Sequence, residues 1–315
     1  MSLPAFMPSR VLPAAFAPEW WGVVALLAVD AIWALAIGFR LEMGWQAAFI
    51  PLTALLLLAG LRGFDHRRTA LFFEYLFLSL SGSFGLVILS YLSLASSGAL
   101  IDSALLAFDR AIGFDWIGLY RGLEQYPALM GGMKLLYQSL LVQGFYVTLL
   151  LGLRGETYEM RELWRLSTIA CILCCLGGML FPALGPFKIF GLEEHGIFLP
   201  DMERLIAGRD LSFDAGALTG VIEFPSFHTV LALACPYALR RTGAIFWIFV
   251  VLDAAMLLTI PFFGGHYLAD MIAGAGVFAA ALGIVKLLEK VSAASALPES
   301  AAAYGGACSS AAPSR

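Results

Sequence analysis

The sequence predicts an all-α protein, a polytopic bundle of transmembrane helices. Of its 315 residues, 60% are hydrophobic and only 13% are charged. Soluble domains are about 45–50% apolar and about 25% charged. The apolar residues also gather into long runs, and a run of about 20 such residues crosses the hydrocarbon core of a bilayer. The small net charge of −4 gives no reason to expect a nucleic-acid partner.

By this length criterion the chain contains about eight candidate spans. They cover residues 20–38, 45–61, 70–95, 131–153, 164–182, 226–240, 243–261 and 266–289. Residues 291–315 are rich in Ala, Ser and Gly, and we expect them to form a disordered tail. No internal repeat is visible, which weighs against many transporter folds.

The distribution of Lys and Arg predicts the orientation, because short cytoplasmic loops carry an excess of these residues. With a cytoplasmic N-terminus, the inner loops hold Arg62, Arg67, Arg68, Arg154, Arg161, Arg165, Arg240 and Arg241. Both termini are then cytoplasmic, in what we expect to be the cell (inner) membrane. The segments before His228 and His266 both fall on the outer, periplasmic side, so the two histidines can share a substrate.

Two outer segments are longer than simple turns. Residues 96–130 mix polar and apolar side chains, which predicts short helices lying in the membrane interface with Trp116 and Tyr120 as anchors. Residues 183–225 form the longest polar stretch. A loop of that length is commonly a lid or a binding element.

His266 and Asp270 are the first pair with chemical potential. On a helix, residues i and i+4 lie on one face, so Asp270 can accept a hydrogen bond from one ring nitrogen of His266. The other nitrogen is then free to act as a nucleophile. Gly264 and Gly265 allow close backbone approach to a ligand, and Pro261 ends the preceding helix. We expect His266 in the first helical turn, where unpaired N–H groups favour an anion. The alternative is a buried pair that only joins two helices.

A second histidine follows Phe224-Pro225-Ser226-Phe227. Pro225 stops the incoming chain, and Ser226 is a natural N-cap, which puts His228 in the first turn of the next helix. Alone, this pattern also fits an ordinary capped helix with an interfacial histidine. If both imidazoles contact one phosphate, they should face a single cavity on the order of 5–8 Å apart.

Taken together, the two motifs carry a family resemblance. Pro-Ser-Phe-His at 225–228, followed by Gly-His-Tyr-x-x-Asp at 265–270, resembles the type 2 phosphatidic acid phosphatase superfamily, and most of all its inositol phosphorylceramide synthase-like branch. Residues 108–116 and 137–140 resemble the branch's segment before its second core helix and that helix itself. The resemblance implies a six-helix core over residues 70–290, preceded by residues 1–69 with two extra helices.

The same resemblance implies a mechanism. His266 becomes phosphorylated, Asp270 orients it, and His228 protonates the leaving oxygen before acting as base toward water or a second alcohol. The substrate is a membrane lipid, and no metal or other cofactor is expected.

The chain departs from the superfamily pattern where the phosphate is usually clamped. Many of its phosphatases carry a Lys-x6-Arg-Pro motif and an Arg six residues before the second histidine, but here that position is Ile260 and no such motif occurs. Missing arginines remove bidentate phosphate contacts. The candidate replacements and other substrate contacts are Lys188, Arg204, Arg209, Ser226 and Gly265.

Three functions remain open from the sequence. The favoured one is a lipid phosphotransferase that moves a phosphoryl or phospho-headgroup between lipids. The second is a phosphatase of the same superfamily acting on lipid phosphates or polyprenyl diphosphates. The third is a non-enzymatic lipid-binding protein or a transporter, in which the His–Asp pair would serve another purpose. The lipid donor and acceptor and the oligomeric state are left open.

Overall fold

A computed structural model describes residues 17–42, 67–214 and 220–295. The predicted span at 45–61 lies outside the described residues, as do residues 296–315 of the expected tail. Residues 291–295 are helical and differ from the expected disorder, because α13 (Leu268–Ser295) continues through them.

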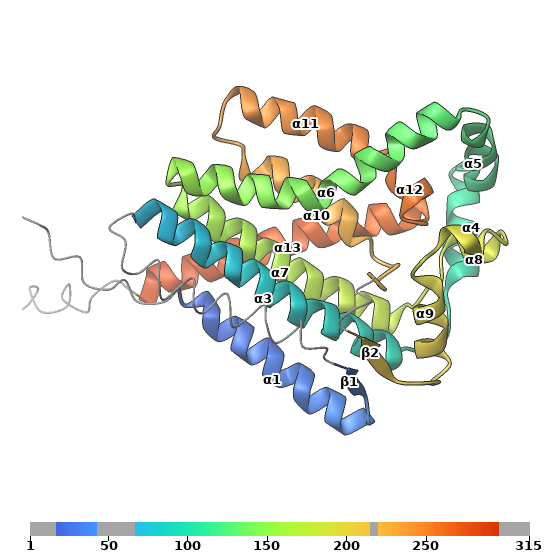
Figure 1. Cartoon of the computed structure of the whole chain (residues 1–315), viewed down its shortest axis with the longest axis horizontal. Coiled ribbons are helices and arrows are strands. Elements are labelled where there is room, and N and C mark those ends of the chain that lie inside the picture. The colour runs from blue at the N-terminus through green and yellow to red at the C-terminus, as the bar shows by residue number, and fades with distance from the viewer. Residues whose placement is uncertain (1–16, 43–66, 215–219, 296–315) are drawn as a thin grey trace, which may run out of the picture.

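Long apolar helices form the body of the molecule (Figure 1). They are α1 (Glu19–Ile37), α3 (Arg67–Ala95), α6 (Pro127–Arg154), α7 (Thr157–Leu180) and α13. Of the described helices, four are long and apolar enough to cross a membrane, and α6 is a fifth if its two parts, bent by 45°, form one span. Helix α7 lies centrally and packs against α3, α10 and α13. The predicted all-α membrane bundle is confirmed.

Two predicted spans are shorter than the sequence indicated. Helix α10 covers Phe227–Ala238, and α11 covers Ala244–Leu257. At 1.5 Å per residue they are about 18 and about 21 Å long, less than a hydrocarbon core of about 30 Å. Helix α10 begins one residue after the start of its predicted span and ends at Ala238, two residues before the predicted end. Helix α11 is followed directly by α12 (Ile260–Phe263), which leads to the second motif.

Short elements cap one end of the bundle. They are α4 (Asp102–Ala111), α5 (Trp116–Glu124), α8 (Pro186–Ile189), η1 (Glu193–His195), α9 (Leu199–Ile206) and the strands β1 (Arg40–Glu42) and β2 (Ser212–Asp214), which pair in parallel. The expected short helices within 96–130 are present. Trp116 and Tyr120 are not interface anchors as predicted, because they stack on each other and are almost fully buried.

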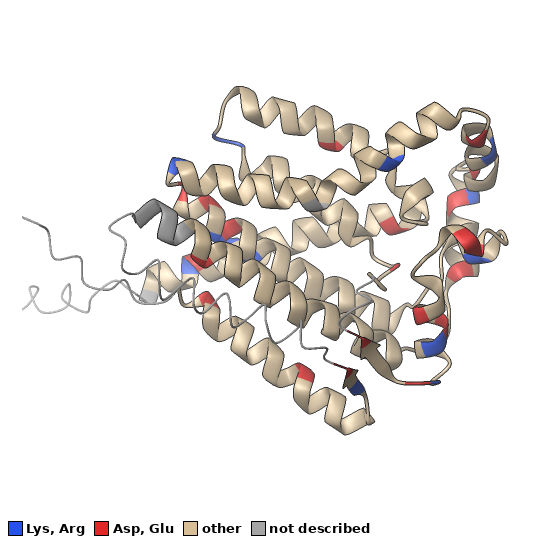
Figure 2. Cartoon of the chain, viewed as in Figure 1, with Lys and Arg blue, Asp and Glu red and all other residues tan. Residues whose placement is uncertain are grey.

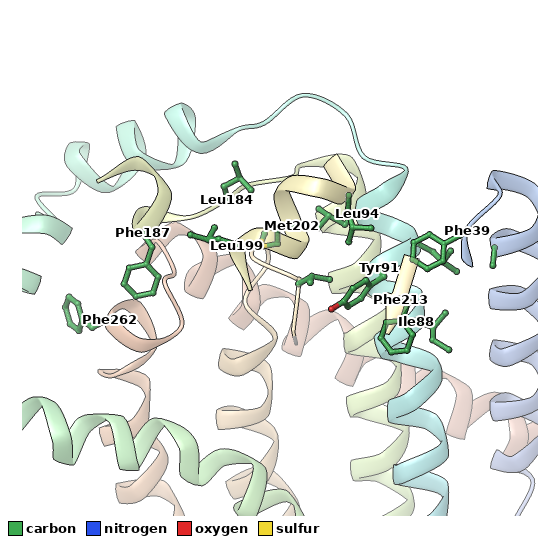
Figure 3. Packing of buried hydrophobic residues seen from close by; sticks show 14 of the residues in the cluster. Phe39, Ile88, Tyr91, Leu94, Leu184, Phe187, Leu199, Met202, Phe213 and Phe262 are labelled. Carbon is green, nitrogen blue, oxygen red and sulfur yellow. The ribbon is translucent and has the colours of Figure 1, made fainter. Parts of the chain in front are cut away.

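An apolar core holds this cap together (Figure 3). Its buried members include Phe39, Ile88, Tyr91, Leu94, Leu184, Phe187, Leu199, Met202, Phe213 and Phe262. They come from the ends of α1 and α3, from the long segment 183–225 and from α12. That segment is therefore folded against the bundle over its described residues, and its packing fixes the turn that carries His266.

Charged side chains gather at the two ends of the helices, with few between them (Figure 2). At one end, the buried Glu162 of α7 forms ion pairs with Arg240, at 2.6 Å, and with Lys286 of α13. At the other end Arg40 pairs with Asp210 at 2.6 Å. Residues predicted to share one side of the membrane therefore meet at one end of the bundle.

Candidate active site

The two histidine motifs converge. His228 lies in the first turn of α10, and His266 lies in the turn between α12 and α13. Their ring centroids are 5.9 Å apart, within the spacing expected from the sequence, and the rings are inclined by 60°. Ser226 caps α10 as predicted by accepting a hydrogen bond from the Thr229 N–H, and its own N–H donates to the Asp270 carbonyl at 3.0 Å. The two motifs are thus joined through their backbones.

His266 faces two carboxylates. Its Nδ1 lies 3.4 Å from Asp270 Oδ2, as the motif predicted, and 3.3 Å from Glu223 Oε1, which the sequence analysis missed. All three side chains are at most 3% exposed. With Nδ1 turned toward the carboxylates, Nε2 is the ring nitrogen left for a substrate.

The start of α13 differs from the expectation. His266 precedes the helix instead of lying in its first turn, and the N–H groups there are occupied. Asp270 accepts from the Tyr267 N–H at 2.8 Å, in the manner of the acidic residue of a capping box. Asp109 of α4 accepts from Leu268 at 2.8 Å and Ala269 at 2.9 Å. The prediction that this terminus is free to bind a substrate anion is therefore wrong.

Two buried carboxylates of α4 support the site. Besides Asp109, Asp102 accepts from the N–H groups of Leu184 and Gly185 and from the Tyr267 hydroxyl at 3.1 Å. One short helix therefore fixes both the loop before α8 and the turn that carries His266. Asp109 belongs to the segment with the family resemblance, so a role could have been sought there. Asp102 gave no such signal.

Tyr137 of α6 completes the histidine pair. Its hydroxyl is 3.0 Å from His228 Nε2, and the two rings stack with centroids 4.9 Å apart. A Cβ placed on Gly264 would lie 2.7 Å from His266 Cδ2 and 3.2 Å from the Tyr137 hydroxyl. Gly264 therefore sits where the tyrosine and the second histidine approach each other, and any larger residue would separate them. Tyr137 belongs to residues 137–140, which the sequence analysis noted for their resemblance to a core helix of the family.

Gly265 and Gly185 allow the surrounding loops to close on Glu223 and His266. Gly265 has φ 73°, and a Cβ on it would be 2.8 Å from the Phe187 ring. Gly185 has φ 85°, and a Cβ there would be 2.7 Å from Glu223 Oε1. Gly265 thus allows close local packing, and its role toward a substrate stays a prediction.

The predicted cationic residues lie in the cap and pair with its acids. Lys188 contacts Glu193 at 2.7 Å and Glu203 at 2.6 Å. Arg204 donates to Asp201, to Ser212 and to the Asp210 carbonyl. Arg209 lies in the exposed turn after α9. None of the contacts just described reaches either imidazole, so their role toward phosphate stays a prediction.

The site is electrostatically unusual for a phosphate-binding centre. Burial raises the pKa of Glu223, and the charge of the neighbouring His266 opposes this shift and favours the carboxylate form. Burial alone would lower the pKa of His266, but the carboxylates of Glu223 and Asp270 outweigh it and raise that pKa. The ligand atoms of these three residues also lie within 4.8 Å of one another, close enough to hold a metal ion.

A comparison with known protein families identifies the superfamily of this chain. Searches of curated proteins and of solved structures found no significant match. A family model described as the PAP2 superfamily matches residues 103–284, more than half of the chain and a stretch that contains both histidine motifs. Membership supports an enzyme that acts on phosphate esters. With its membrane-spanning helices and paired imidazoles, the chain belongs to the PAP2 superfamily.

Proposed function

We propose that this protein is a membrane lipid phosphotransferase of the inositol phosphorylceramide synthase-like branch, working through a phosphohistidine. The observation that carries the proposal is the pair of imidazoles with ring centroids 5.9 Å apart, one of them with its Nδ1 3.4 Å from the Asp270 carboxylate. That spacing fits one phosphoryl group between the rings, with hydrogen-bond reach of about 3 Å on each side.

The reaction has two steps. In the first, the lone pair of His266 Nε2 forms a bond to phosphorus, the bond from phosphorus to the leaving oxygen breaks, and His228 gives that oxygen a proton. In the second, an acceptor hydroxyl loses its proton to His228 and attacks phosphorus, and the P–N bond breaks. Both histidines return to their starting protonation states. The Tyr137 hydroxyl, hydrogen-bonded to His228 Nε2, fixes the orientation of the imidazole that transfers the proton.

Transfer and hydrolysis differ only in whether a lipid alcohol or water attacks the phosphohistidine. The His266 side chain is 2% exposed, and a site that excludes water favours an alcohol acceptor over hydrolysis. The lipid chains would approach from the bilayer while the phosphate meets the imidazoles at the outer end of the bundle, with both chain termini cytoplasmic. Lys188 is our first candidate for the cation that meets the phosphate, and it would exchange Glu193 and Glu203 for it.

Isotopic trapping tests this function. Purified protein is incubated with ³²P-labelled lipid phosphate, and the label on the protein is tested for the alkali stability and acid lability of phosphohistidine. We expect labelling of the wild type and none of His266→Ala. His228→Ala should lose about 10²–10⁴-fold in turnover, the usual contribution of general acid–base catalysis. Turnover near wild type in either variant would refute the roles, and phosphate release without an acceptor would favour the phosphatase.

A further inference from the structure

Glu223 is a fully buried carboxylate for which the reaction above has no task. It lies in the loop before α10, and its ion-pair partner among the described residues is His266. Within the part of the chain that the structure describes, no well-aligned hydrogen bond joins Glu223 Oε1 or His266 Nδ1 to a neighbour. A buried carboxylate is costly to keep unless it is paired. The pairing with His266 therefore calls for an explanation.

The surrounding backbone is shaped to hold this carboxylate. The absence of a side chain at Gly185 leaves room for Glu223 Oε1, which a Cβ would approach to 2.7 Å. On the other side, Pro225 packs so closely on Gly177 of α7 that a Cβ there would lie 2.4 Å from its ring. Both contacts fix the loop and aim Glu223 at the imidazole.

We propose that Glu223 is a positioning residue for the phosphoryl transfer, acting through His266 Nδ1 together with Asp270. When Nε2 bonds to phosphorus while Nδ1 keeps its proton, the ring gains a positive charge. A carboxylate 3.3 Å from Nδ1 stabilises that charge. Glu223 and Asp270 thus assist from the nucleophile side in a chain that lacks the usual phosphate-clamping arginines. This inference rests on the proposed function.

Several other titratable groups surround His266 and enter any account of its charge. His228 of α10 faces its ring, and Tyr137 of α6 lies behind His228. Asp270 belongs to α13. Two acids of α4 are close enough to interact with these carboxylates, Asp102 with Glu223 and Asp109 with Asp270. Among these groups, only Glu223 and Asp270 form ion pairs with His266. Neutralising Glu223 should therefore act directly on this imidazole.

The decisive measurement is the titration of His266, because it does not depend on turnover. The full-length protein, ¹⁵N-labelled at its four histidines, is titrated by NMR in lipid nanodiscs, and the His266 signal is identified by its loss in His266→Asn. We expect Glu223→Gln to lower the pKa of His266 by about 1–3 units, the usual effect of removing a neighbouring opposite charge. Glu124→Gln, the same change at an exposed glutamate of α5, should leave it unchanged. An unchanged pKa in Glu223→Gln overturns the proposal.

Kinetics supply the second arm. The imidazole must be neutral at Nε2 to attack, so the low-pH limb of kcat/KM should move to lower pH in Glu223→Gln. On the plateau above this limb, kcat should fall about tenfold, the change equivalent to one pKa unit, because the charge that stabilises the phosphorylated ring is lost. Glu223→Asp keeps the charge and should keep the limb. A merely structural role would lower the yield of folded protein without moving the limb.

Two outcomes separate this inference from its rivals. Activity lost in EDTA and restored by Zn²⁺ or Mn²⁺ would make Glu223, His266 and Asp270 metal ligands and would overturn the positioning role. A wild type that forms no phosphohistidine would remove the proposed function. The NMR shift would then still report whether Glu223 controls the charge of His266.

Discussion

Tyr137 ties the histidine pair to α6 through a single hydroxyl. Replacing it with Phe keeps the stacked ring but removes the hydrogen bond to His228 Nε2. The loss of one such bond is about 1–1.5 kcal/mol, or roughly tenfold in rate if the bond is fully used in the transition state. We therefore expect Tyr137→Phe to lower kcat about tenfold with little change in thermal stability, measured as lipid phosphate turnover of purified protein. Tyr146→Phe, at an exposed position of the same helix, is the matched control. A kcat for Tyr137→Phe equal to that of the control would show that the hydroxyl takes no part.

At the scale of single residues, the sequence predicted the contacts between residues that are close in the chain. The N-cap at Ser226 and the nearness of Asp270 to His266 follow from spacings of two to four residues, and both are present. Glu223 could not be predicted in the same way. It meets His266 only because two loops fold against each other, and an acid in a polar loop carries no sign of burial.

Among the elements, α4 determines how α13 begins. Asp109→Ala would leave the N–H groups of Leu268 and Ala269 without their partner, at a cost of about 1–3 kcal/mol for each buried group. Asp115 caps the exposed start of α5, where its replacement by Ala should cost about 1 kcal/mol. Thermal unfolding in detergent should therefore give a clearly lower Tm for Asp109→Ala than for Asp115→Ala. Equal values would mean that α13 does not depend on this cap.

The same helix explains an error of sequence interpretation. The mixed polarity of residues 96–130 is typical of a helix lying in the interface. The acids at 102 and 109 instead face inward and are buried, because they satisfy backbone N–H groups of distant segments. Periodicity reports which residues share a helix face, but it does not distinguish a polar face directed at water from one directed at orphaned donors. The length of α11 was overestimated for a related reason, since its apolar run continues past Leu257 into α12.

Across the whole molecule, charged residues lie mainly at the two ends of the helices (Figure 2). The imidazoles lie at the capped end, where Phe187 of α8 contacts Gly265 in the turn that carries His266. The opposite end contains Arg240 and Lys286 around Glu162. The positive-inside rule predicts that this second end is cytoplasmic, and the proposed phosphate site would then be on the outer face.

Cysteine labelling in intact cells tests that orientation. Ile197 in the cap is 79% exposed, and Arg241 at the opposite end has a side chain that is 71% exposed. The four described cysteines are buried, so a Cys308→Ser background leaves the introduced thiol as the accessible one among the residues that the structure describes. A membrane-impermeant maleimide should label Ile197→Cys in intact cells but Arg241→Cys only after permeabilisation, because the bilayer separates the two ends. The reverse pattern would place the paired imidazoles on the cytoplasmic face, and the lipid phosphate would then have to be supplied from that leaflet.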